Sequence, residues 1–151
     1  MSSFARDWAR QKTRTGTVHR PIIDLLFQEK EGFNLYTFIV DSGADISLAP
    51  RQLADRIGIN WAKGSKVTLT GISSKPECSV IGRIQIVNAV IPDLGLEIDF
   101  PMCFAEGNAP YLVGREGFFD HFTITLNKKT RRTIFRSRKA KTHIFQTKSS
   151  V

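Results

Sequence analysis

A carboxylate follows directly on an apolar run in residues 38–45, FIVDSGAD. The run predicts that Asp41 lies at least partly buried, where a charge without support is costly. Ser42 adds a hydroxyl, Gly43 lets a backbone amide approach the carboxylate, and Ala44 leaves space beside it. These neighbours suit an acid that exchanges protons with a bound molecule. A plain turn is the alternative reading, since Asp, Ser and Gly all favour turns.

A second motif, YLVGREGFF, occupies residues 111–119. Together the two motifs resemble the signature of the retropepsin-like aspartic proteases. In that family an apolar run is followed by Asp, Ser or Thr, Gly, Ala and often a second acid, and two apolar residues, Gly and Arg follow later in the chain. The resemblance covers residues 20–135, with both motifs in the family's order. It implies an all-β fold, mostly β with one or two short helices, arranged as a closed β-barrel or sandwich with a flap hairpin.

The resemblance also implies roles for individual residues. Asp41 would be the catalytic acid, and the hydroxyl of Ser42 would tie two catalytic loops together across a dimer. Gly43 would hydrogen-bond the substrate main chain. A buried acid and arginine pair would brace the site, because arginine presents a planar fork to a carboxylate. The residues implied as support for the site are Ser42, Gly43, Ala44, Asp45 and Arg115, with Val113 and Gly114 packed behind the loop.

The elements that would position this loop are mainly strands. Residues 20–28 and 33–40 predict a hairpin whose second strand ends at Asp41. A short strand follows in residues 45–49, and a short helix in 50–59, with Pro50 near its start and Gly58 at its end.

The second half of the chain continues the strand pattern. Residues 96–105 predict a strand broken at Pro101, because proline cannot donate to a strand ladder. Residues 111–114 predict a short buried strand and 115–122 a helical turn or two. The segments 123–126 and 132–135 would close the sheet.

Residues 65–91 alternate apolar and polar side chains on both sides of a polar centre, which predicts a long hairpin with its tip within 71–78. In the family order this hairpin is the flap that closes over the substrate. The substrate contacts it would supply are Gly71, Ile72, Ser73 and Ser74. The tip has one glycine where family flaps often have more, and an ordinary surface hairpin is the alternative.

Amide hydrolysis by this chemistry needs two carboxylates that share one proton, and aspartic proteases are a standard example of such a pair. The DSGA motif occurs once in 151 residues. We therefore expect a homodimer with one Asp41 from each subunit, acting on a peptide or protein substrate. We expect no metal and no organic cofactor, because Cys78 and Cys103 form no Cys/His cluster.

The net charge of +8 comes from the two ends of the chain. Residues 1–20 carry five basic residues (Lys or Arg) and one acidic residue, and residues 127–151 carry nine basic residues and no acidic one. Residues 21–126 carry eight basic and thirteen acidic residues. We expect a flexible basic segment in 1–19, the protease-like domain in 20–135, and a loosely ordered basic tail in 136–151.

Basic segments can contact the phosphates of nucleic acid. Nucleic acid is not expected as a partner, since no recognised nucleic-acid fold is present, but the basic ends leave it open. A second alternative function is a dimeric module with the same fold that binds extended peptides but is catalytically weak or inactive.

The cellular compartment follows from what the sequence lacks. The first residues have no apolar stretch typical of a signal peptide, and no apolar run approaches the ~20 residues of a membrane span. Two cysteines are too few for a disulfide framework. We expect a cytoplasmic protein without membrane association.

Overall fold

The chain is built of strands, with one short α-helix and two turns of 3-10 helix, as expected for an all-β protein. The computed structural model describes residues 2–69 and 79–138. The strands are β1 (Ser3–Asp7), β2 (Ala9–Thr13), β3 (Gly16–Arg20), β4 (Ile22–Glu29), β5 (Gly32–Val40), β6 (Ser47–Pro50), β7 (Ser65–Leu69), β8 (Val80–Ile91), β9 (Leu96–Ala105), β10 (Leu112–Val113), β11 (Phe122–Asn127) and β12 (Arg132–Ser137). The helices are α1 (Arg51–Arg56), η1 (Trp61–Lys63) and η2 (Phe119–His121).

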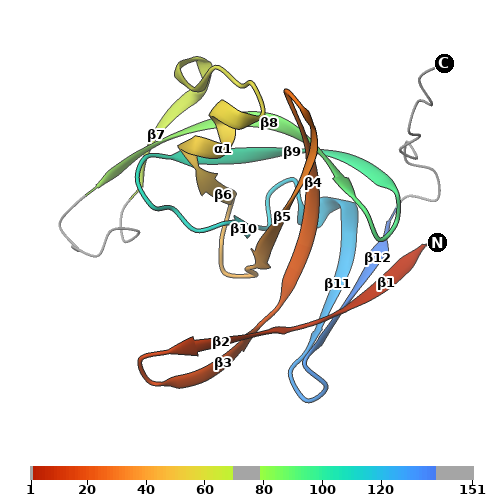
Figure 1. Cartoon of the computed structure of the whole chain (residues 1–151). Coiled ribbons are helices and arrows are strands. Elements are labelled where there is room, and N and C mark those ends of the chain that lie inside the picture. The colour runs from red at the N-terminus through yellow and green to blue at the C-terminus, as the bar shows by residue number, and fades with distance from the viewer. Residues whose placement is uncertain (1, 70–78, 139–151) are drawn as a thin grey trace.

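Six of these strands close into a mixed barrel in the order β4-β5-β10-β6-β9-β8 (Figure 1). The pairing of β10 with β5 and of β6 with β9 is parallel, whereas the other neighbours are antiparallel. Closure depends on one pair, in which Leu26 of β4 lies opposite Val90 of β8. The expected closed barrel is confirmed, with β7 added at the outer edge of β8.

The hairpin of β4 and β5 delivers the chain to Asp41. Ile23, Leu25 and Phe27 alternate along β4 and are buried on one face, which is the period-two pattern of a strand covered on one side. The pairs run from Ile22 opposite Ile39 to Glu29 opposite Gly32. The predicted hairpin of residues 20–28 and 33–40 is thus confirmed.

Phenylalanine dominates the interior of the molecule. Each buried ring contributes about 2 kcal/mol by leaving water. Trp61 reaches the same core and donates its indole N–H to the carbonyl of Phe104 at 2.8 Å. The fully buried rings are Phe27, Phe38, Phe100, Phe104, Phe118, Phe122 and Phe135.

Helix α1 follows β6 without a loop and covers one end of the barrel (Figure 1). Pro50 precedes its first residue, and Leu53 and Ala54 are its buried side chains. Gly58, with φ of +77°, takes the left-handed conformation that ends many helices. The predicted helix of residues 50–59 is confirmed, although it is only six residues long.

The long hairpin of residues 65–91 forms from β7 and β8, with pairs from Ser65 opposite Ile84 to Leu69 opposite Val80. The tip, including Gly71, Ile72, Ser73 and Ser74, lies outside the described residues. The expected break of the next strand at Pro101 is wrong. Strand β9 pairs with β8 continuously across this position, and its pairing with β6 begins only at Met102, beyond the residue that lacks an N–H.

The strands β11 and β12 do not close the barrel sheet, contrary to expectation. They form a separate three-stranded sheet with β1, in the order β1-β12-β11. Phe4 of β1 stacks on Phe135 of β12 at 4.8 Å between ring centres, and Arg6 pairs with Asp24 of β4 at 2.7 Å. The ion pair joins this sheet to the barrel, and so does the buried core, which Phe122 and Phe135 share with the barrel strands.

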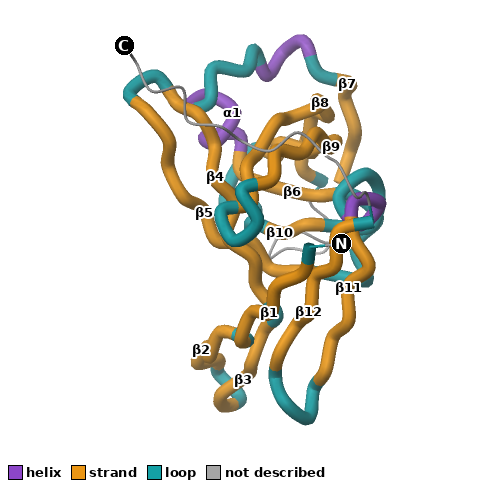
Figure 2. The backbone as a smooth tube through the Cα atoms, turned by 90° about the vertical axis from the view of Figure 1, so that its right-hand side faces the viewer, coloured by secondary structure: helices purple, strands orange, loops and turns teal. Residues whose placement is uncertain are grey.

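The N-terminal residues differ from the flexible segment that their charge suggested. Besides β1, they form the antiparallel ribbon of β2 and β3, which lies beside the three-stranded sheet below the barrel (Figure 2). Residues 136 and 137 belong to β12, and 139–151 lie outside the described residues. No described helix has the length and apolar character needed to cross a membrane.

Candidate active site

The loop of residues 41–46 joins β5 to β6 and leaves a gap one strand wide between them. Strand β10 fills this gap. Its Leu112 lies beside Ile39 in parallel and opposite Leu48 in antiparallel pairing, while Val113 lies beside Val40. The two segments that carry the sequence motifs therefore meet here, although they are far apart in the chain.

Backbone hydrogen bonds fasten the loop to the segment that follows β10. The amide of Asp41 donates to the carbonyl of Val113 at 3.0 Å. The amide of Arg115 donates to the carbonyl of Ala44, also at 3.0 Å. Because both ends of the loop are held, the barrel fixes its conformation together with the hydrogen bonds inside the loop.

The carboxylate of Asp41 is half-buried and takes a hydrogen bond from within the loop. Its Oδ1 accepts from the amide of Gly43 at 2.9 Å. A Cβ at residue 43 would lie 3.3 Å from the same oxygen, so glycine gives this contact its room. The amide holds Oδ1 in place, and no hydrogen bond to Oδ2 forms among the described residues.

Gly114 lies behind the loop where a side chain cannot fit. A Cβ there would come within 2.7 Å of the carbonyl carbon of Ile46 and 2.9 Å of the carbonyl oxygen of Ala44. The Gly114 amide donates to the hydroxyl of Ser47 at 3.0 Å, in a fully buried contact. Close backbone approach explains the glycine after the two apolar residues of the second motif.

Ser47 is a member of this site that sequence reasoning missed. It is completely buried and is one of three buried polar residues among those described. The sequence feature that could have indicated its role is a serine in an otherwise apolar segment, directly before Leu48 and Ala49. A buried hydroxyl requires a partner, which the Gly114 amide provides.

We expect Ser47→Ala to lower the free energy of unfolding by about 2 kcal/mol, because the buried amide of Gly114 would lose its acceptor. Urea denaturation followed by tryptophan fluorescence measures the change. Ser65→Ala, on the exposed start of β7, is the matched control and should change stability by less than about 0.5 kcal/mol. Equal effects of the two substitutions would contradict the role of this hydrogen bond.

Asp45 and Arg115 form the ion pair that the two motifs suggested. The pair is not buried in the single chain, contrary to expectation, because the side chains are 84% and 52% exposed. The loop presents its second acid outward, toward solvent. An exposed pair of this kind adds little to the stability of one subunit.

The structure thus gathers most of the predicted site residues around one loop. Ser42 and Gly43 are exposed at the bend of the loop, Ala44 is half-buried, and Val113 is fully buried behind it. The four predicted flap residues are outside the described part of the chain. Within the described ranges, no group of three His, Cys, Asp or Glu side chains could hold a metal ion.

No family model and no curated protein sequence matches the chain. Among solved structures, the chain is similar to a retropepsin-like aspartic protease from Rickettsia conorii. The TM-score is 0.60 at 16% sequence identity, and the match covers 89% of this chain and 98% of that one. The chain has a retropepsin-like fold. At this level of identity the likeness establishes the arrangement of the strands and not the chemistry.

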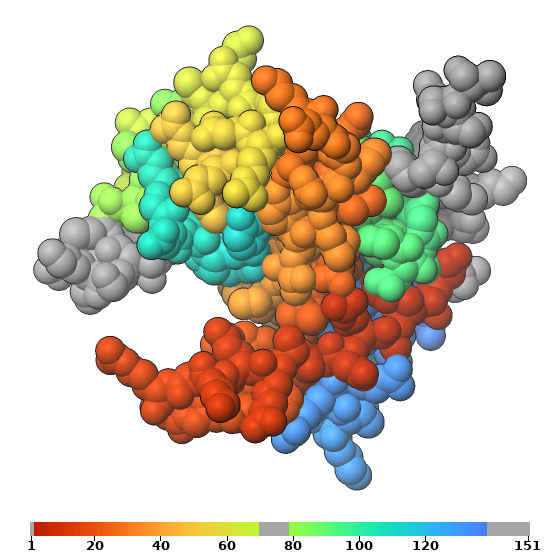
Figure 3. Space-filling model, in the orientation of Figure 1, coloured from red at the N-terminus to blue at the C-terminus, as the bar shows by residue number. Residues whose placement is uncertain are grey.

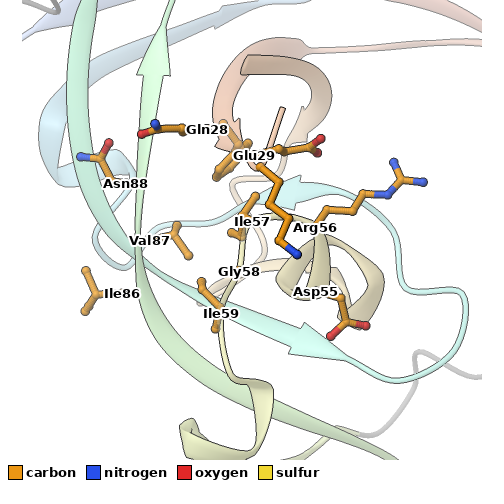
Figure 4. A pocket seen from close by; sticks show the side chains of 12 residues that line it. Gln28, Glu29, Asp55, Arg56, Ile57, Gly58, Ile59, Ile86, Val87 and Asn88 are labelled. Carbon is orange, nitrogen blue, oxygen red and sulfur yellow. The ribbon is translucent and has the colours of Figure 1, made fainter. Parts of the chain in front are cut away.

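The retropepsin-like barrel also carries a hollow of about 540 Å³. Figure 4 shows its walls, formed by the end of β4, the C-terminal end of α1 and the middle of β8, with Arg56 and Asp55 at the rim and Ile57, Ile59 and Val87 toward its floor. Residues 41–46 contribute nothing to it. The hollow is therefore separate from the loop that carries Asp41.

Proposed function

We propose that this protein is an aspartic endopeptidase that acts as a homodimer, with Asp41 of each subunit forming the catalytic pair. One observation carries the proposal. Within a retropepsin-like fold, the barrel fixes the loop of a half-buried Asp41 whose Oδ1 accepts the amide of Gly43 at 2.9 Å. A carboxylate positioned by backbone contacts, with one side left open, suits acid-base chemistry on a bound molecule.

In the proposed reaction, two Asp41 carboxylates share one proton. The ionised carboxylate takes a proton from a water molecule, which attacks the peptide carbonyl carbon. The protonated carboxyl polarises the carbonyl oxygen and stabilises the tetrahedral intermediate. The proton taken from water then passes to the amine as the C–N bond breaks, so that the pair returns to its starting state.

The second carboxylate has to come from another copy of the chain. The loop holds two acids, and Asp45 is engaged by Arg115, so that Asp41 is the acid of the loop without a cation partner among the described residues. One chain therefore supplies half of the pair. A twofold axis beside the loop would bring the two halves together and would cover the exposed Asp45–Arg115 pair.

The hairpin of β7 and β8 is the proposed flap. It pairs along five residues of each strand and extends from the barrel edge. A peptide held extended beneath it would be shielded from bulk water during the reaction.

We expect cleavage of a mixed peptide library between pH 4 and 7, with a specific activity that falls on dilution in step with the dimer fraction. Sedimentation velocity at the same protein concentrations measures that fraction. Activity that is independent of concentration in a monomer would contradict the shared site. Peptide binding without cleavage, in a stable dimer, would support the alternative of a binding module.

A further inference from the structure

Two basic hairpins meet below the barrel. The ribbon of β2 and β3 projects as an arm in Figure 3, and the turn between β11 and β12 lies near its base. Between them is a hollow of about 400 Å³. Its lining comes from both hairpins: Trp8, Thr17, Val18, His19, Lys128 and Arg131.

The cations of the ribbon gather on the face that meets this hollow. Arg10 and Lys12 are two residues apart on β2, and Arg10 lies directly opposite His19 of β3, so these three side chains share one face. The hairpin turn adds Arg14, and the facing turn adds Lys128, Lys129 and Arg131. Charges of one sign thus approach from two elements.

Among the described residues, no carboxylate neutralises these cations. The nearby acids have other partners: Asp7 pairs with Arg132 at 3.1 Å, and Asp24 pairs with Arg6 at 2.7 Å. Two of the six cations, Lys128 and Arg131, line the hollow, and the other four lie on the hairpins that form it. Together they attract anions from solution.

His19 lies among these cations at the wall of the hollow. Desolvation lowers the pKa of this imidazole, and the charges of Arg131 and Arg10 lower it further. The ring nitrogen Nε2 lies 3.2 Å from Nη1 of Arg131. The imidazole is therefore neutral near pH 7, and an anion in the hollow would restore its ability to take a proton.

Arg131 has a backbone conformation that favours glycine. Its φ of +52° is the only positive value at a non-glycine residue in ranges 2–69 and 79–138. The Arg131 carbonyl accepts the amide of Trp8 at 2.9 Å, which fixes the turn against the ribbon. A long cationic side chain in a disfavoured conformation at the wall of a binding hollow points to a role for the side chain and not for the turn.

We propose that this hollow binds a phosphate of a nucleic acid strand, and that the cations of the ribbon follow the adjoining backbone. Guanidinium groups match phosphate oxygens with two parallel hydrogen bonds. A membrane surface fits less well, because the hairpin tips, residues 13–16 and 128–130, have no large apolar side chain to insert. The inference is independent of peptidase activity, so Asp41→Asn should bind nucleic acid as the natural protein does.

Fluorescence anisotropy of a labelled 20-nucleotide single strand, over a salt series, tests the site on the full chain. The variant combines Arg10→Gln, Lys12→Gln and Arg131→Gly. We expect at least tenfold weaker binding and a salt slope lower by about two, which is ~0.7 for each phosphate contact removed from a single strand. The control combines Lys30→Gln, Lys63→Gln and Lys66→Gln, which remove the same charge from exposed positions away from the ribbon.

Equal loss of affinity in the two triple variants would overturn the proposal, because it would reduce binding to net charge. Vesicles of anionic lipid, or poly-glutamate, that bind as tightly through the same three residues would overturn the choice of nucleic acid. Arg131→Gly alone should melt no lower than the natural protein, since glycine accepts this φ. An unchanged melting temperature would show that weaker binding by the Arg131→Gly variant does not result from unfolding.

A second readout follows His19 itself by NMR. The groups that face the imidazole are Arg10 from β2, and Lys128 and Arg131 from the opposite turn. A bound phosphate offsets these charges, so the pKa of His19 should rise when the oligonucleotide is added. An unchanged titration curve in the saturated complex would contradict binding at this hollow.

Discussion

Asp41→Asn is expected to abolish peptide cleavage, with a loss of at least about 10³-fold in kcat/KM. An amide can neither take a proton from water nor share one with a second carboxylate. Its oxygen can still accept the amide of Gly43, so the loop and the barrel should keep their structure. The change therefore separates the chemistry from the fold, which makes it the sharpest test of the proposed activity.

Cleavage rates and thermal melting of the purified protein measure the two effects of this substitution. Asp93→Asn, in the exposed turn between β8 and β9, is the matched control and should leave cleavage unchanged. Mixing equal amounts of natural and Asp41→Asn chains, after exchange of subunits, leaves about a quarter of the dimers with two aspartates. Cleavage by the pure variant, or half activity in the mixture, would remove Asp41 from a shared catalytic pair.

Gly114→Ala is expected to destabilise the protein by about 3 kcal/mol and to distort the loop of Asp41. The added methyl group would lie 2.7 to 2.9 Å from backbone atoms of Ile46 and Ala44. Backbone cannot rotate away as a side chain can, so the loop has to leave β10. The amide that Ser47 binds would move with it.

Chemical denaturation and cleavage assays of this variant should both show a loss. Gly43→Ala is the comparison for stability, because its added carbon would meet only the Asp41 carboxylate, at 3.3 Å. It should cost less than about 1 kcal/mol. If the two alanine substitutions had the same effect on stability, the close packing behind the loop would not be what holds it.

Most of the barrel could be predicted because local patterns and the global fold agree there. The alternation of Ile23, Leu25 and Phe27 predicted β4, and Pro50 and Gly58 marked the two ends of α1 correctly. The loop of Asp41 was found from its unusual composition. The contact between this loop and residues 113–115 was predicted from the order of motifs in the retropepsin-like family. No local sequence pattern predicts a contact between segments so far apart in the chain.

The structure differs from the sequence-based predictions where contacts between distant residues determine the conformation. Charge density predicted a flexible N-terminus, but Phe4 finds a partner in Phe135 and β1 completes a sheet with β12. Pro101 predicted a break, but its missing N–H falls just before the pairing with β6 begins. Ser47 was missed because a single serine at the start of a buried strand has no local sign of the amide that it will bind.

The way β10 fits between β5 and β6 has a consequence for folding. Its two residues pair with strands that lie far earlier in the chain, and closing such distant contacts is the slow part of folding a β-barrel. The backbone contacts around Asp41 are therefore incomplete until residues 112 and 113 have been synthesised and have paired.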